Sequence, residues 1–177
     1  MYIHKTTGTV GYLKEIYKKH NNLYIQANGE DAVLYYEDDS NESMFNSKRS
    51  YKVQDSMGDL NDKLTTVIYH IPAYGIGRST IIGHLTDFAN KARQMKGLSS
   101  FRIATRIDDG SYLVMLTFVE LAAYHDFKHT TTYKNYLTTE VLKKFRNEEG
   151  MFQDFVRSTI YFSLYDNEEN FKSEDEY

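Results

Sequence analysis

Residues 100–119, SFRIATRIDDGSYLVMLTFV, decide the fold of this chain. They contain two runs rich in β-branched and aromatic residues, 100–107 and 112–119, separated by Asp108-Asp109-Gly110. Asp-Gly supplies the positive φ angles that a tight turn needs, so the stretch predicts a β-hairpin. Its second strand is apolar at both parities, whereas a strand with one face in water alternates. We therefore expect both faces of the sheet to be buried, one under helices and one against another sheet.

The sequence on either side of the hairpin predicts a βαββαβ order. The apolar run 66–71 predicts a strand. Apolar residues then recur at spacings of three and four from Ile81 to Met95, which is typical of an amphipathic helix. After the hairpin, residues 120–145 predict a helical region broken near residues 130–132, and residues 158–165 predict a last strand. This order is the ferredoxin-like pattern, in which two helices cover one face of a four-stranded antiparallel sheet.

The N-terminal half repeats part of this order more weakly. A short strand at residues 2–5 and a helix-like stretch with Leu13, Ile16 and Tyr17 precede two strands, at 23–26 and 32–36, that an Asn-Gly turn joins. This is βαββ again. Further along, we interpret residues 51–60 as a short degenerate helix.

We expect an α+β barrel of the dimeric type, closed within one chain. A degenerate N-terminal half, residues 1–62, would complete the sheet of a ferredoxin-like domain at residues 63–166. The alternative is an N-terminal cap on a domain that closes its barrel by forming a homodimer. The acidic residues 167–177 predict a disordered tail.

Composition excludes several classes of function. The formal net charge is −4 with the signs mixed, which does not suit a nucleic-acid-binding protein. The chain has no cysteine, so disulfides, thiolate nucleophiles and zinc-thiolate sites are impossible. No segment approaches the roughly 20 apolar residues that span a bilayer. We expect a cytoplasmic protein that is at most peripheral to a membrane.

Several short segments resemble a known family. Together with the order of elements, they are similar to the family of the staphylococcal signal transduction protein called target of RNAIII-activating protein (TRAP), within the antibiotic-biosynthesis-monooxygenase (ABM) superfamily. Bacillary heme-degrading monooxygenases are related to it. The resemblance covers nearly the whole chain and is thin between residues 38 and 64. The segments are Thr7-Gly8-Thr9-Val10-Gly11-Tyr12-Leu13, Ile71-Pro72, Phe101-Arg102 and Ala123-Tyr124-His125-Asp126-Phe127-Lys128.

The resemblance places the heme site of the small heme-degrading members on Tyr69, Phe127 and Leu137. Those members use an asparagine, a tryptophan and a histidine heme ligand at these positions, and all three residues differ here. Leucine cannot ligate iron, so the usual hold on heme is lost. If the barrel cavity binds heme or another small apolar ligand, the resemblance implies contacts with Tyr69, Phe118, Phe127 and Leu137, and Tyr69 is the candidate axial ligand.

No catalytic motif stands out in the sequence. His125 and His129 lie four apart on a predicted helix, a spacing that metal sites use, but a third ligand is needed, so we interpret them as surface histidines with a metal site as the alternative. The sequence therefore favours a TRAP-like regulatory or stress-response protein. The alternatives are a divergent heme-degrading monooxygenase, with heme as ligand or substrate, and cofactor-free oxygenation of a small aromatic substrate.

Overall fold

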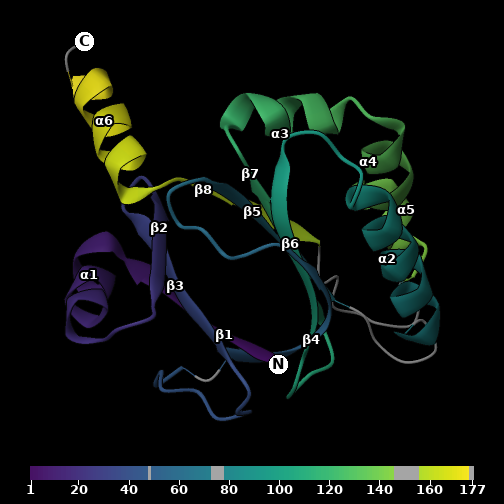
Figure 1. Ribbon diagram of the computed structural model, residues 1–177, viewed down its shortest axis with the longest axis horizontal. Helices are drawn as coiled ribbons and strands as arrows, with labels where there is room; N and C mark the ends of the chain where they lie inside the picture. The colour runs from purple at the N-terminus through teal and green to yellow at the C-terminus, as the bar shows by residue number, and fades with distance from the viewer. Residues whose placement is uncertain (48, 73–77, 146–155, 176–177) are drawn as a thin grey trace.

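The protein is described by a computed structural model for residues 1–47, 49–72, 78–145 and 156–175. At its centre is one antiparallel sheet, which curls into a nearly closed barrel (Figure 1). The described strands, in chain order, are β1 (Tyr2–Thr9), β2 (Tyr24–Asn28), β3 (Asp31–Asp38), β4 (Arg49–Met57), β5 (Thr65–Ile71), β6 (Leu98–Arg106), β7 (Tyr112–Phe118) and β8 (Arg157–Tyr161).

The sheet consists of two halves with the same topology. The strand order is β2-β3-β1-β4 in the N-terminal half and β6-β7-β5-β8 in the C-terminal half, so the second strand of each half comes first and the fourth comes last. The halves join where β4 pairs with β6. At the other seam Ala27 and Phe162 exchange backbone hydrogen bonds of 2.9 and 2.8 Å. One chain thus builds the barrel, and the predicted completion by an N-terminal half is confirmed.

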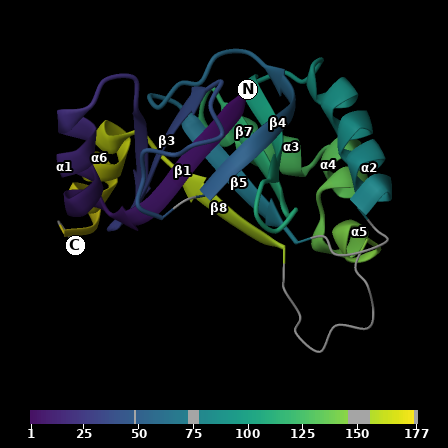
Figure 2. The same ribbon diagram turned by 90° about the horizontal axis from the view of Figure 1, so that it is seen from below.

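Helices cover the outside of the barrel on two sides (Figure 2). Helices α2 to α5 lie over the C-terminal half, while α1 and α6 lie beside the N-terminal half. The predicted break in the helical region 120–145 is confirmed, because Thr130 and Thr138 each cap a new helix by accepting a hydrogen bond from a backbone N–H three residues on. The helices are α1 (Val10–Lys19), α2 (Arg78–Ala92), α3 (Leu121–Lys128), α4 (Thr131–Tyr136), α5 (Thr139–Lys143) and α6 (Leu164–Asp175).

The core has an inner and an outer layer. All seven residues of β7 are buried, which confirms that both faces of the sheet are covered. Alternation along β5 divides the layers: Val67, Tyr69 and Ile71 face the helices, whereas Ile68 faces the barrel interior. A third apolar cluster lies under α1, around Leu13.

The predicted helix at residues 51–60 is wrong. Residues 49–57 form β4, which pairs with β1 on one side and β6 on the other. Tyr51 and Val53 point into the barrel and Lys52 points outward, the alternation of a strand with one wet face. The N-terminal half therefore lacks the second helix of its repeat, and residues 39–47 form a loop in that place.

The prediction of a disordered acidic tail from residue 167 is wrong for the described part, because residues 164–175 form α6. The Ser163 hydroxyl accepts a hydrogen bond of 3.1 Å from the Asp166 N–H and caps the helix. The buried Asn167 side chain accepts from the Gly29 N–H at 2.8 Å and donates to the Gly29 carbonyl at 2.9 Å. Two hydrogen bonds to one backbone unit fix the helix on the β2–β3 turn.

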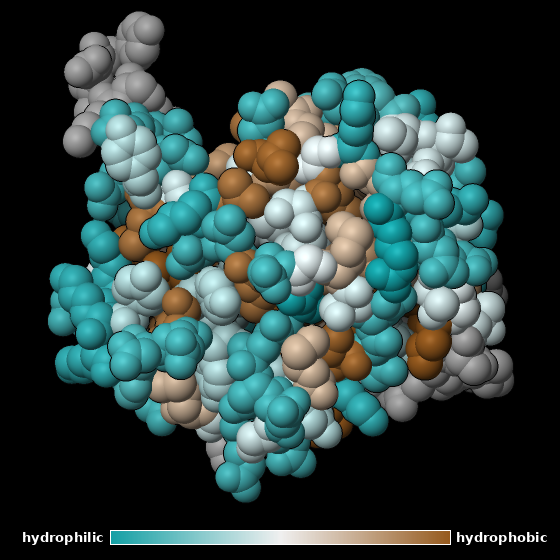
Figure 3. Space-filling model, viewed as in Figure 1, coloured by the Kyte–Doolittle hydropathy of each residue, from teal (hydrophilic) through white to brown (hydrophobic). Residues whose placement is uncertain are grey.

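Hydrophilic residues cover most of the face drawn in Figure 3, and hydrophobic residues appear there in small separate groups. Within the described ranges, no helix combines the length and the apolar composition needed to span a bilayer.

Candidate functional site

The structure brings the four residues predicted as ligand contacts into one cluster. Tyr69 comes from β5, Phe118 ends β7, Phe127 lies on α3, and Leu137 ends α4. All four are buried in the layer between the sheet and helices α2 to α5. Strand parity points Tyr69 and Phe118 away from the barrel interior, and Phe127 and Leu137 belong to the helical layer above them, so the four residues lie outside the barrel.

Aromatic rings pack against one another among these residues. The ring centroids of Phe118 and Phe127 lie 5.4 Å apart, and so do those of Phe118 and Tyr124. Phe127 also meets Tyr133 edge-on at 5.5 Å and Phe88 at 6.4 Å. These are favourable separations for aromatic pairs. Among the described residues, the cluster is therefore a closely packed aromatic core around the predicted contacts.

Tyr69 stays a neutral phenol in this surrounding. Burial raises its pKa well above the ordinary value, and the hydrogen bond between its hydroxyl and that of Tyr124, at 3.5 Å, acts in the same direction. A tyrosine binds iron as a phenolate, so the surroundings of Tyr69 work against the axial-ligand role that the resemblance left open.

His125 and His129 lie on exposed surface at the end of α3. Among the described residues, no group of three or more His, Cys, Asp or Glu side chains is placed to hold a metal ion. The structure therefore supplies no third ligand from the described residues for these two histidines.

His70 points into the barrel, which settles a parity that the sequence left undecided. Burial, together with the nearby charges of Lys5, Arg49, Arg106 and Arg157, lowers its pKa to about 3. The imidazole is thus neutral at neutral pH, and it faces a group of basic side chains at one end of the barrel.

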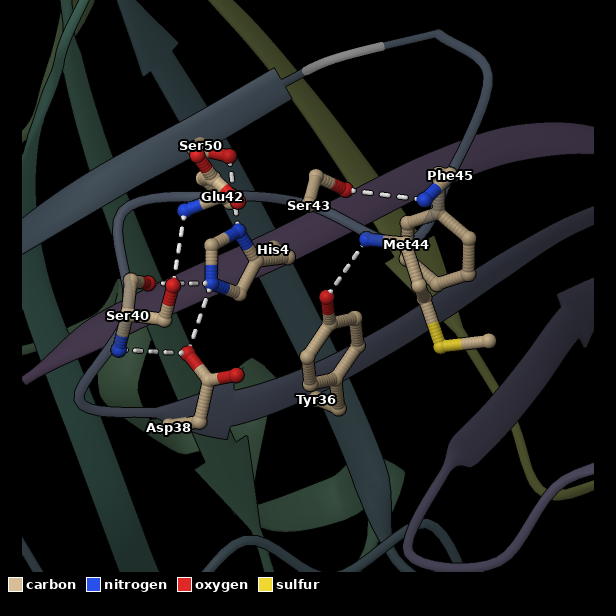
Figure 4. Close-up of polar contacts among 9 residues, drawn as sticks. All are labelled: His4, Tyr36, Asp38, Ser40, Glu42, Ser43, Met44, Phe45 and Ser50. Atoms are coloured by element: carbon tan, nitrogen blue, oxygen red, sulfur yellow. Dashed lines mark hydrogen bonds and ion pairs between the residues drawn. The ribbon is translucent and has the colours of Figure 1, made fainter.

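A polar network around His4 escaped prediction (Figure 4). His4 lies on the outward face of β1, fully buried beneath the loop 39–47. Its Nδ1 is 2.6 Å from Ser50 Oγ, and its Nε2 is 2.9 Å from both Asp38 Oδ1 and the Ser40 carbonyl oxygen. A carboxylate and a carbonyl only accept hydrogen bonds, so Nε2 carries a proton, and in the neutral ring Nδ1 accepts from the Ser50 hydroxyl.

The same network holds the loop onto the sheet. The Tyr36 ring stacks on His4 at 4.7 Å and meets Phe45 edge-on at 5.4 Å. The Tyr36 hydroxyl also accepts a hydrogen bond of 2.8 Å from the Met44 N–H. These contacts cover the sheet where the N-terminal half lacks its second helix.

The order of Ser50, His4 and Asp38 matches the hydrogen bonding of a hydrolytic triad. A triad must also admit a substrate to its nucleophile. Here His4 has no exposed surface and Ser50 is 8% exposed, because the loop lies over both. The arrangement therefore acts as a polar clip that fixes the loop. No sequence motif predicts this clip, because 46 positions separate His4 from Ser50.

Comparisons with known proteins agree with the resemblance found in the sequence. No protein-family model matches the chain. A Signal transduction protein TRAP from Staphylococcus epidermidis is 21% identical over 162 residues, which cover 91% of this chain and 97% of the relative. A protein of the same name from Staphylococcus aureus is 20% identical over 162 residues, covering 90% and 96%. The predicted similarity to TRAP proteins is confirmed over nearly the whole chain.

Solved structures confirm the fold class. A major regulator of staphylococcal pathogenesis superposes with a TM-score of 0.80 at 17% identity, covering 93% of this chain and 99% of the other. A ferredoxin-fold protein from Listeria monocytogenes related to antibiotic biosynthesis monooxygenases gives 0.73 at 20% identity, covering 90% and 92%. A heme-degrading enzyme from the same species gives 0.71 at 17% identity, covering 92% and 99%. The chain therefore has an ABM-type α+β fold.

Proposed function

We propose that this chain is a regulatory protein of the TRAP type, built on an ABM-type barrel, and that it does not act as an oxygenase. Two lines support the regulatory part. The curated relatives are named as signal transduction proteins, and the similarity extends over more than 90% of their length. A regulator of staphylococcal pathogenesis shares the fold at a TM-score of 0.80.

The observation that carries the proposal is the close packing of the aromatic cluster among the described residues. At the positions where the resemblance puts the heme site, Phe127 and Leu137 are 3% and 2% exposed, and Tyr69 is 4% exposed. A flat macrocycle needs an open slot and an axial ligand, and a buried neutral phenol is a poor ligand. The rings of Phe118, Phe127 and Tyr124 pack against one another at these positions. This packing favours the regulatory role over heme binding.

The alternative is a divergent heme-degrading monooxygenase. A heme-degrading enzyme shares the fold, so heme stays a possible ligand or substrate. In such an enzyme the bound heme itself activates oxygen, and the protein supplies binding and orientation. A heme or a small apolar ligand would then have to displace part of the aromatic cluster around Tyr69.

In this role the protein acts in the cytoplasm, and its partners are not nucleic acids. The formal net charge of −4 opposes binding to a phosphate backbone. Stress response and virulence control are the regulatory roles that the similarity suggests.

A heme titration of the purified chain, followed in the Soret region, tests the proposal. The same sample then receives ascorbate to drive turnover, and Tyr69→Phe is the matched variant. We expect a non-saturating response that is the same in both proteins. A saturable band that Tyr69→Phe abolishes and that decays to a biliverdin-like product would overturn the proposal in favour of the enzyme.

A second experiment addresses the regulatory part directly. The gene is deleted, and the deletion is complemented with the wild-type chain or with Tyr69→Phe. We expect altered transcript levels after deletion and equal restoration by both chains. Unchanged transcript levels after deletion would contradict the regulatory role.

A further inference from the structure

One end of the barrel interior collects basic side chains from five strands. Arg49 and Arg157 are the first residues of β4 and β8, Arg106 is the last residue of β6, and His70 is the penultimate residue of β5. Lys5 of β1 lies directly opposite Arg49. The ends of these strands therefore place four basic side chains and one imidazole at the same end of the barrel.

The internal repeat builds this group twice. In the N-terminal half the first strand places Lys5 opposite Arg49 of the fourth strand, and in the C-terminal half the first strand places His70 opposite Arg157 of the fourth strand. Like charges directly opposite each other on a sheet destabilise it. The Lys5–Arg49 pair is therefore a cost to folding that a bound anion would offset, whereas the neutral His70 leaves the charge of Arg157 unopposed by a second cation.

Lys5 is the centre of the group. It is 1% exposed, and its parity matches that of Ile3, which belongs to the inner core. Burial, together with the charges of Arg49 and Arg106, lowers its pKa to about 7. A buried ammonium group is costly unless it is paired.

The two carboxylates of the β6–β7 turn pair with Arg106 and not with Lys5 or Arg49. Asp108 and Asp109, on the β6–β7 turn, form ion pairs with Arg106 at 2.6 and 3.5 Å. The Tyr51 hydroxyl also faces this end, and its pKa is raised to about 12 by burial. Of the ion pairs among the described residues, none includes Lys5, Arg49 or Arg157.

We propose that this end of the barrel is a binding site for a phosphate group, either inorganic phosphate or a small phosphomonoester, held by Lys5 and Arg49 with His70 as a neutral hydrogen-bond partner. Arginine forks and lysine ammonium groups form the strong charge-assisted hydrogen bonds that phosphate oxygens accept. Cations on opposite walls suit a tetrahedral dianion better than a monoanion, since one dianion can meet both halves of the repeat. The site is separate from the aromatic cluster and does not depend on the regulatory proposal.

The test is calorimetric titration of the full chain with inorganic phosphate and, separately, with glycerol 3-phosphate, at pH 7 and constant ionic strength set with NaCl. We expect saturable binding of at least one of them, and the tighter ligand identifies free phosphate or the ester as the better occupant. Replacing Lys5 by methionine should raise Kd by about tenfold or more, because it removes a hydrogen bond to a charged group.

The matched control is Lys52→Met. Lys52 lies on the exposed outer face of β4, so this variant loses the same charge and should keep the wild-type Kd. Thermal unfolding guards against a folding defect, because methionine in place of a buried ammonium group should leave Tm unchanged or higher without ligand. Phosphate should then raise the Tm of the wild type and of Lys52→Met but not of Lys5→Met. No saturable heat with either ligand, or equal binding by Lys5→Met and the wild type, would overturn the proposal.

Discussion

Replacing Phe127 by alanine should be among the most destabilising single changes in this protein. The ring is 3% exposed and lies 5.4 Å from Phe118, 5.5 Å from Tyr133 and 6.4 Å from Phe88. Truncating a buried phenylalanine costs about 3–5 kcal/mol from lost transfer energy and the cavity left behind. For a chain of this size that corresponds to a fall in Tm of about 6–20 °C.

The assay is equilibrium unfolding in urea at neutral pH, with far-UV circular dichroism as the signal. Tyr12→Ala is the matched control, because this ring on α1 is 61% exposed and its loss should change stability by less than about 0.5 kcal/mol. A loss below about 1 kcal/mol for Phe127→Ala would refute the reasoning. It would mean that the rings do not fill the layer between sheet and helices, and an open pocket there would favour the heme-binding alternative.

Three further changes test other parts of the structure. Asn167→Ala removes both hydrogen bonds to Gly29 and should cost about 1–3 kcal/mol, measured by urea unfolding, with faster proteolysis of α6; unchanged stability would show that α6 is not fixed by this side chain. His4→Ala should free the loop 39–47, so that limited proteolysis cuts there much faster than in the wild type, and an unchanged cleavage rate would argue against the clip. The folded-state pKa of Lys5, about 7, lies below its unfolded value of 10.5, so the folded chain binds fewer protons than the unfolded chain between these two pH values. The free energy of unfolding of the wild type, measured relative to that of Lys5→Met, should therefore rise from about pH 7 to about pH 10. A difference that stays constant with pH would contradict the lowered pKa.

Local patterns carried most of the prediction of the fold. The Asp-Gly turn places Gly110 at a φ of 72°, and the hairpin on either side of it forms as expected. Threonine caps likewise divide the helical region at Thr130 and Thr138. These features depend on neighbours a few residues away, so a single sequence is enough to find them.

The errors fall where distant segments decide the local structure. Residues 49–57 carry polar side chains on one face and become a strand because β1 and β6 pair with them from both sides. In α6, the Ser163 cap with Asp166 three residues on was a helix-start signal, but Asn167 stabilises the helix through Gly29, 138 positions away. The high density of acidic residues led to a prediction of disorder in spite of this helix-start signal.

Of the candidate sites, one could be predicted from the sequence and the others depend on contacts between distant segments. The aromatic cluster could be predicted as a set only through the family resemblance, because the sequence alone left the strand parity, and hence the face of the sheet, undecided. The roles of His4 and Lys5 could not be predicted, since a histidine and a lysine on a short N-terminal strand are typical of an exposed edge. Only the register of β1 with β4 puts Ser50 beside His4 and Arg49 beside Lys5.

The repeat explains why the two faces of the sheet differ in what they can do. The outward positions of the first strands have diverged: Tyr69 lies under four helices in one half, and His4 lies under a polar loop in the other. The inward positions next to them still carry basic groups in both halves, opposite Arg49 and Arg157. These two arginines begin the fourth strands, and β8 meets β2 through the Ala27–Phe162 bridge. A ligand at this end would contact both halves at once, so its binding would stabilise the closed form of the barrel. Anion binding would thereby be coupled to the conformation of the protein, which is a physical means of regulation.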